Sequence, residues 1–240
     1  MNDGKLRGPA WLRAPLRWLL DSATVNMFRA DKWLLVAFLA LSASALAPMF
    51  VTLILPLVDM GVNIGAAGLL KDAGFGHGVV AQHYFVNPRL VPYWTVYLLM
   101  GGLASVFGPF WSVKLTVGLA VILLPLSSMR LMRAFGRDPR LGLWVFALSW
   151  DRNLYWGWIT FSLGMAMCLW ALALVFEVRS LRSALKLVPL SIVIALTHIH
   201  AVVLTLVAGG LLALVKKPIS RAIGLHVIAL SGCALLVAPW

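Results

Sequence analysis

Long apolar stretches separated by short polar links dominate the chain. A run of about 18 apolar residues is long enough to cross a bilayer as a helix, and a helix satisfies its own backbone hydrogen bonds inside hydrocarbon. The stretches do not alternate polar with apolar residues, as the strands of a membrane barrel do. The pattern therefore predicts an all-α, polytopic transmembrane helical protein with six to seven membrane segments. The long stretches are residues 33–58, 90–107, 111–129, 154–176, 187–215 and 222–238.

The links between these stretches predict the domain organisation. Residues 1–32 are basic and precede the first stretch, so we expect a cytoplasmic amphipathic segment there, followed by one transmembrane domain over residues 33–240. Residues 59–89 contain six glycines and two histidines, which predicts an outer loop with a short interfacial helix at 64–70. Residues 141–150 are too short to cross a membrane and indicate a half-helix or a re-entrant segment.

The N-terminal segment has the spacing of a helix that lies on the membrane surface. Its apolar residues recur at helical spacing against two arginines. A disordered basic tail is the alternative. The apolar residues are Trp11, Leu12, Leu16, Leu19 and Leu20, and the arginines are Arg13 and Arg17.

Composition supports a membrane protein and narrows its partners. Hydrophobic residues make up 62% of the chain and charged residues 12%, a balance that a soluble globule could not bury. The net charge of +12 comes from clusters between apolar stretches, which favours anionic membrane lipids as partners over nucleic acid. Cys168 and Cys233 lie in apolar stretches and form neither a disulfide framework nor a CxxC metal site. We predict a bacterial inner-membrane protein with a cytoplasmic N-terminus.

Two topologies fit the same stretches. Strict alternation from a cytoplasmic N-terminus places the arginine-rich link at residues 130–140 outside. If one segment between Asp59 and Arg130 dips without crossing, that link and the basic link at 179–186 both face the cytoplasm. The positive-inside rule favours the second arrangement.

Acidic and histidine residues at the ends of the apolar stretches are the candidates for chemistry. Asp59 directly follows the first stretch, where a carboxylate can stay ionised; an ordinary charged helix end is the alternative. His77, His83, Asp72 and Arg89 share the outer loop and could place a base and phosphate-binding donors around Asp59. A solvated loop of unrelated polar residues is the alternative for that group.

Two further polar groups interrupt later stretches. Asp151, Arg152 and Asn153 form either a polar turn or part of a site. His198 and His200 are two residues apart, so on one helix they point about 200° apart and only one can join a small site. A buried neutral histidine is the simpler interpretation of such a residue, and a haem or chlorophyll ligand is the alternative.

The layout resembles the N-terminal half of GT-C-type integral membrane glycosyltransferases, and more closely uncharacterised bacterial multi-pass proteins that share it. The likeness rests on the order of segments and on three strings, LVPYWTVYLLMGGLASVFGPFWSVKLTVGL, NLYWGWITFSLGMAMCLWAL and LTHIHAVVL. The resemblance implies a sugar donor carried on a polyprenyl phosphate and an acceptor from the extracytoplasmic side. Asp59 would then be the general base or a carboxylate that binds a divalent metal ion, and His83 or Arg89 would meet the charge of the leaving phosphate. Asp151, Asn153 and His198 are the other expected substrate-binding residues.

A second class of function fits the chain as well. The short length and the abrupt apolar end at Trp240 also suit a non-enzymatic structural or cofactor-binding subunit of a larger membrane complex, with protein partners. In members of the resembled group paired acids often begin the outer loop, whereas Asp59 is followed by Met60. A catalytically silent relative is therefore a further expectation.

Overall fold

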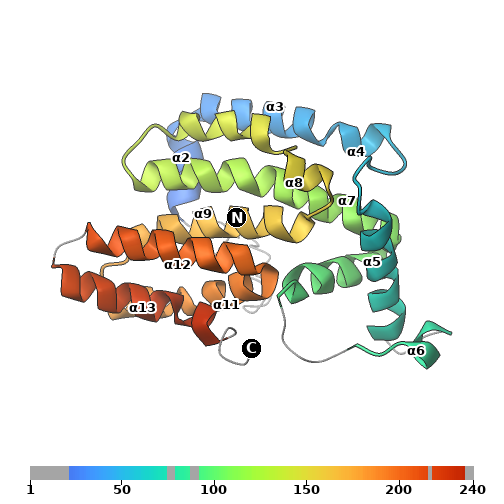
Figure 1. The fold of residues 1–240 in the computed structure, drawn as a ribbon. Coiled ribbons are helices and arrows are strands. Elements are labelled where there is room, and N and C mark those ends of the chain that lie inside the picture. The colour runs from blue at the N-terminus through green and yellow to red at the C-terminus, as the bar shows by residue number, and fades with distance from the viewer. Residues whose placement is uncertain (1–21, 75–78, 87–91, 216–217, 236–240) are drawn as a thin grey trace, which may run out of the picture. The chain divides into compact units, whose positions relative to one another are not determined.

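The protein is helical throughout the part that the structure describes. A computed structural model describes residues 22–74, 79–86, 92–215 and 218–235. The N-terminal amphipathic helix predicted over Trp11 to Leu20 lies outside these residues. In chain order the helices are α2 (Ser22–Ala30), α3 (Lys32–Leu46), α4 (Pro48–Val51), α5 (Met60–Gly74), α6 (Val80–His83), α7 (Trp94–Ala134), the 3₁₀ helix η1 (Pro139–Leu148), α8 (Arg152–Tyr155), α9 (Ile159–Glu177), α10 (Leu181–Leu185), α11 (Val188–Thr197), α12 (Ile199–Leu214) and α13 (Ile219–Leu235) (Figure 1).

The chain divides into two compact units, Met1–Ala40 and Leu41–Trp240. In the first unit, the Asp31 carboxylate accepts a hydrogen bond of 3.0 Å from the backbone N–H of Leu34 and so caps the start of α3. The rings of Phe28 and Phe38 lie 5.4 Å apart between α2 and α3. The candidate site lies entirely in the second unit.

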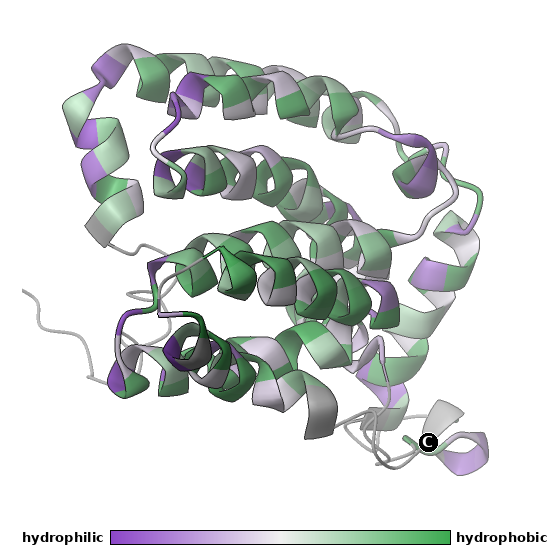
Figure 2. Ribbon diagram, turned by 60° about the vertical axis from the view of Figure 1, so that its left-hand side comes forward, coloured by the Kyte–Doolittle hydropathy of each residue, from purple (hydrophilic) through white to green (hydrophobic). Residues whose placement is uncertain are grey.

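Three helical stretches are long and apolar enough to cross a membrane. They are Lys32–Val51, Trp94–Ala134 and Ile159–Glu177, and α12 and most of α13 are shorter apolar helices. Hydrophobic residues predominate along these helices (Figure 2), and many of them are exposed, such as Trp33, Val36 and Leu39 of α3, which is typical of helices solvated by lipid. The predicted all-α class is thus confirmed for the described residues, with three candidate spans.

Helix α7 consists of two parts that meet at a sharp bend. The backbone leaves the helical conformation at Gly108 (φ 79°, ψ 162°), where the sequence predicts a turn before Pro109. The Ser112 hydroxyl after the bend donates to the carbonyl of Met100 before it, so the two parts fold back on each other. We call residues 94–107 α7a and residues 109–134 α7b.

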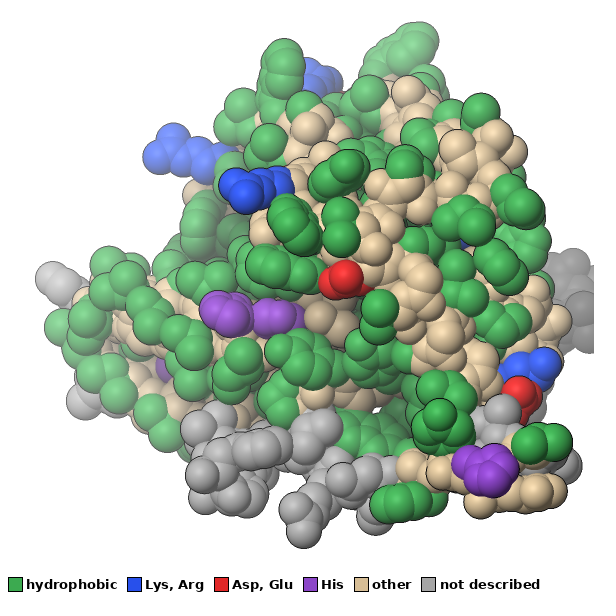
Figure 3. Space-filling model, turned by 45° about the vertical axis from the view of Figure 1, so that its right-hand side comes forward, with side chains coloured by type: hydrophobic (Ala, Val, Ile, Leu, Met, Phe, Trp, Pro, Cys, Tyr) green, Lys and Arg blue, Asp and Glu red, His purple; other side chains and the backbone are tan. Residues whose placement is uncertain are grey.

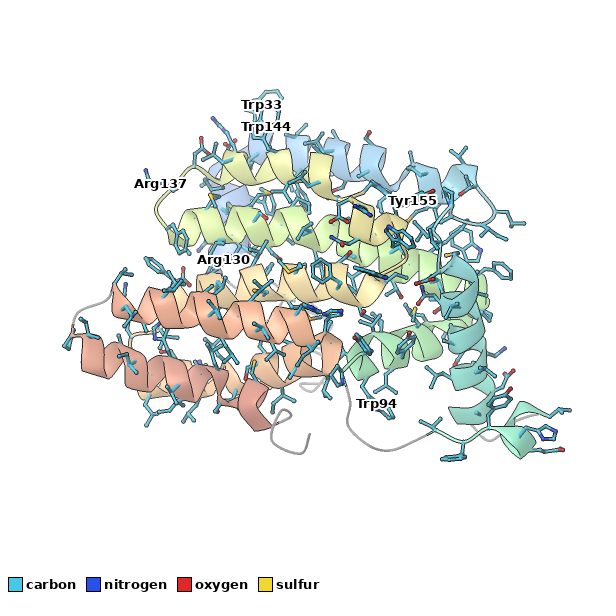
Figure 4. All side chains as sticks on the ribbon, viewed as in Figure 1. Trp33, Trp94, Arg130, Arg137, Trp144 and Tyr155 are labelled. Carbon is cyan, nitrogen blue, oxygen red and sulfur yellow. The ribbon has the colours of Figure 1, made fainter. Side chains whose placement is uncertain are left out.

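Helices α7b and α9 run side by side in the same direction (Figure 1). Val117 of α7b and Leu163 of α9 belong to one core cluster, and Arg130 further along α7b pairs with Glu177 at the end of α9. The 19 residues of α9 span about 28 Å, close to the thickness of a hydrocarbon core. Arg137 lies at one end of these helices and Tyr155 at the other (Figure 4). We call these the arginine end and the Asp59 end.

The apolar stretch at 187–215 is not one span but a helical hairpin. Ala171 of α9 packs in one cluster with Ile194 of α11, whereas Gly164, about two turns nearer the Asp59 end, lies against Ala201 of α12. Further along, Leu172 clusters with Leu212. Helix α11 therefore runs against α9 and α12 runs with it, so the chain reverses at His198. The extended backbone of His198 (φ −164°, ψ 133°) makes this reversal.

Two other boundaries differ from the sequence prediction. The first membrane helix ends at Val51 and not at residue 58, because Thr52 is extended and Pro56 cannot continue a helix. The predicted interfacial helix at 64–70 is longer, and α5 runs across the Asp59 end of α9 and α12 (Figure 1).

The Arg130–Glu177 ion pair predicts a measurable loss of stability. Arg130 is buried, with Nη1 donating to Glu177 Oε1 at 2.9 Å and Nη2 donating to Oε2. Replacing Glu177 with glutamine would remove the carboxylate charge that pairs with this buried cation. Since the Glu177 side chain is 44% exposed, we expect a loss of about 2 kcal/mol, below that of a fully buried pair. Thermal unfolding in detergent would measure it, with Glu177→Asp as the charge-preserving control; an unchanged Glu177→Gln would contradict the prediction.

Candidate functional site

The segment that carries Asp59 is fixed at its beginning by a buried lysine. Lys114 of α7b is 5% exposed, and its Nζ donates to the carbonyls of Met49 (2.8 Å) and Thr52 (2.5 Å) at the end of α4. The ammonium also lies 5.0 Å from the ring centre of Trp111, a distance suited to a cation–π interaction. A charge at this depth is costly unless polar groups surround it, so Lys114 holds the start of the connection that leads to Asp59.

Backbone contacts with the α8–α9 connection fix Asp59 itself. Its N–H donates to the Trp156 carbonyl at 3.2 Å. The buried Asn63 side chain donates to the carbonyls of both Asp59 (3.0 Å) and Gly157 (3.1 Å). Gly157 has φ +87°, and a Cβ there would lie 2.8 Å from the Asp59 Cβ. Only glycine fits both the backbone conformation and the contact.

The Asp59 carboxylate lines a cavity of about 540 Å³ at the Asp59 end. Asn63, Tyr97, His198 and His200 also line it, with backbone and aromatic groups from the start of α9. Histidine side chains and an acidic side chain gather on one mostly hydrophobic face (Figure 3). Among the described residues, the carboxylate of Asp59 has no hydrogen-bond or ion-pair partner, so it is available to a ligand.

Both histidines of the THIH segment line this cavity, and the prediction that only one could do so is wrong. Their ring centres lie 5.1 Å apart. The prediction assumed one continuous helix, but His198 is the extended residue between α11 and α12, and His200 lies in the first turn of α12. Spacing along a helix does not apply across such a break.

Hydrogen bonding indicates which nitrogen of His198 carries a proton. Its Nδ1 accepts a bond of 3.2 Å from the backbone N–H of His200, so the neutral ring has its proton on Nε2. The ring is buried and meets Tyr93 and Phe161 edge to face, at 5.2 and 5.4 Å. His198 therefore offers one fixed donor, and the exposed His200 a freer one.

The other predicted site residues lie elsewhere. Asp151 caps α8, accepting from the N–H of Leu154 at 2.9 Å, and the Asn153 side chain donates to the Asp151 carboxylate. Both are thus engaged in a local turn and do not line the Asp59 cavity. His83 is exposed on α6, also away from the cavity lining. Arg89 lies outside the described residues.

Sequence reasoning missed most of the other residues that line the cavity, among them Asn63, Tyr93, Tyr97 and Gly157. Gly157 follows Tyr155 and Trp156, shortly after the polar residues 151–153. A glycine at this position could have been predicted to form a turn. Tyr93 and Tyr97 are four residues apart in the sequence, which is helical spacing, but they match the aromatic belt of a membrane helix equally well. Tyr93 has φ 83°, a conformation that costs a non-glycine residue energy and is frequent at binding sites.

A second, apolar groove adjoins the Asp59 cavity. It has a volume of about 410 Å³ and lies between α5, α7a and residues 84–86. Leu69, Phe85 and Leu98 are among its lining residues, and Tyr93 and Tyr97 line both the groove and the cavity. The two spaces together offer a polar end and an apolar end to one ligand.

The described residues supply few metal ligands here. No group of three or more His, Cys, Asp or Glu side chains among them is arranged to hold a metal ion. No family model, curated protein or solved structure matches the chain.

Proposed function

We propose that the protein is a GT-C-type glycosyltransferase that takes its sugar from a polyprenyl-phosphate donor. One observation carries this proposal. The Asp59 carboxylate, which has no hydrogen-bond or ion-pair partner among the described residues, shares a cavity with two histidines, directly beside an apolar groove. A lipid-linked sugar needs both environments, with its sugar phosphate in the polar cavity and its chain in the groove.

Charge distribution supports an extracytoplasmic site. The links after α7b and α9 both lie at the arginine end, as the Arg130–Glu177 pair and the contact between Phe135 and Phe176 indicate. The positive-inside rule assigns that end to the cytoplasm. The opposite end, with Asp59, then faces the extracytoplasmic side, where GT-C-type enzymes use polyprenyl-linked donors.

A non-crossing α7a is consistent with this orientation. Tyr93, just before α7a, lines the Asp59 cavity, and Pro109, just after it, contacts Gly68 of α5. Both of its ends thus lie on the Asp59 side. With α7a, η1, the α11–α12 hairpin and α13 counted beside α3–α4, α7b and α9, this arrangement has seven membrane-embedded segments in the described part of the chain, within the predicted six to seven.

The chemistry follows from the cavity residues. Asp59 accepts the proton of a hydroxyl group on the acceptor, and the oxygen of that hydroxyl forms a bond to the anomeric carbon of the donor sugar. The bond from that carbon to the phosphate oxygen breaks, and the electron pair leaves with the polyprenyl phosphate. The Nε2–H of His198 and the ring of His200 donate to the leaving phosphate in place of His83.

Donor consumption tests the proposal. The protein is reconstituted into vesicles with radiolabelled polyprenyl-phosphate sugars, and release of free polyprenyl phosphate is measured against protein-free vesicles. We expect release of polyprenyl phosphate with at least one lipid-linked sugar, and no release of nucleotide when nucleotide sugars are supplied instead. Stable association with a fixed set of other membrane proteins, without any donor turnover, would instead support the structural-subunit alternative.

A further inference from the structure

Two tyrosines mark the junction between the Asp59 cavity and the apolar groove. Among the described residues, Tyr93 and Tyr97 alone line both spaces. Beyond them the groove is built from aliphatic and aromatic side chains, whereas the acidic, amide and histidine side chains line the cavity. A ligand with one part in each space must therefore pass these two tyrosines.

The two tyrosines differ in what they can offer a ligand. The Tyr93 ring packs edge to face against His198, with the ring centres 5.2 Å apart. Tyr97 is half-buried, and its phenol interacts electrostatically with the Asp59 carboxylate. Since Asp59 lines the cavity and not the groove, this interaction places the Tyr97 hydroxyl on the cavity side of the junction. In the part of the chain that the structure describes, that hydroxyl has no hydrogen-bond partner.

Packing on both sides of Tyr97 fixes its position. Two residues before it, the Thr95 hydroxyl donates to the carbonyl of Val193 in α11 at 3.3 Å. One turn after it, Gly101 lies against α5, where an added Cβ would be 3.0 Å from the Cβ of Leu70. A hydroxyl on a helix held in this way loses little freedom when a ligand binds.

The chemistry of a lipid-linked sugar decides what this hydroxyl meets. The phosphate of such a molecule joins the sugar to the lipid chain, so it lies at the junction when the sugar is beside Asp59 and the chain is in the groove. A cationic side chain at this position would make the Asp59 carboxylate a weaker proton acceptor. A neutral phenol O–H can donate to the phosphate without that effect.

We propose that the Tyr97 hydroxyl binds the phosphate of the lipid-linked donor. The inference rests on the proposed function for the identity of the lipid and adds a phosphate-binding residue to the same site. Tyr97 donates from α7a, while His198 and His200 donate from the turn that begins α12. The phosphate thus sits where the polar and apolar parts of the site meet.

Two lipids that differ only in the phosphate test the proposal. Purified full-length protein in detergent is titrated with polyprenyl phosphate and with the matching polyprenol, and bound lipid is counted by native mass spectrometry. Wild type should prefer polyprenyl phosphate. Tyr97→Phe keeps the ring and removes the donor, and a hydrogen bond to a charged group is worth about tenfold or more in affinity. The variant should therefore bind polyprenyl phosphate about tenfold more weakly and bind polyprenol as wild type does.

A second tyrosine provides the matched control. Tyr155 is exposed at the Asp59 end (Figure 4) and lines neither space, so Tyr155→Phe should leave both affinities unchanged. The proposal is overturned if wild type shows no preference for the phosphate, or if Tyr97→Phe binds polyprenyl phosphate as tightly as wild type. Equal weakening of both lipids by Tyr97→Phe would indicate a structural role and also overturn it.

Two further measurements separate this inference from its neighbours. Phosphatidic acid that wild type binds as tightly as polyprenyl phosphate would assign the site to bilayer phospholipids and contradict the proposal. Donor turnover is measured separately. Turnover by wild type with an unchanged Tyr97→Phe affinity would remove Tyr97 from the site and leave the proposed function standing. A phosphate preference that Tyr97→Phe abolishes, without any turnover, would support the phosphate site and contradict sugar transfer.

Discussion

Replacing Asp59 with asparagine is expected to lower sugar transfer by about two to four orders of magnitude, the usual contribution of a general base. Asparagine has the same shape, and the contacts that fix Asp59 come from its backbone N–H and carbonyl. The variant should therefore insert and unfold like wild type while losing the proton acceptor. Release of polyprenyl phosphate by reconstituted protein measures the loss.

A matched acid separates this effect from a general change of charge. Asp72 lies on α5, in the same outer segment, but does not line the Asp59 cavity. Asp72→Asn should keep full activity. Equal activity of Asp59→Asn and wild type would remove Asp59 from the mechanism, even if donor turnover itself is observed.

Replacing Gly157 with alanine should be the most damaging change to the site's geometry. The left-handed backbone (φ +87°) disfavours alanine, and the new methyl group would lie 2.8 Å from the Asp59 Cβ and 3.0 Å from its backbone nitrogen. We expect a loss of about 3 kcal/mol of stability. Displacement of the carboxylate by about 1 Å should also lower transfer by about a hundredfold.

Gly65 provides the control for this prediction. It lies in α5, where an added Cβ meets nothing within 4 Å, and alanine favours a helix. Gly65→Ala should therefore unfold at or slightly above the wild-type temperature and keep its activity. A Gly157→Ala protein with normal stability and activity would show that the close approach to Asp59 is not required.

Together the two variants distinguish chemistry from positioning. Asp59→Asn should lose activity at constant stability, whereas Gly157→Ala should lose both. The carboxylate performs the proton transfer, and the glycine only permits the backbone of Asp59 to lie against the α8–α9 connection. A shared loss of stability would instead indicate that Asp59 has a structural role.

The sequence by itself determined the class of the protein and the polar positions at the ends of its segments. Apolar length and the cost of unpaired backbone groups in lipid leave helices as the solution, and Pro109 after Gly108 marks a bend that the structure contains. The sequence also indicated Asp59 as a candidate, because a carboxylate next to an apolar stretch costs free energy near the membrane and is therefore a functional candidate by default.

Tertiary structure alone decided which of those polar residues meet. Asp59 and His200 are 141 positions apart in the chain, and they line one cavity because α11 and α12 reverse at His198 and bring that turn to the start of α9. Asp151 and Asn153, equally polar in the sequence, bond to each other and to a local backbone N–H. Helical periodicity relates only residues that lie on one helix. The single extended residue His198 lets α12 leave α11 in a new direction, and packing against α9 determines that direction.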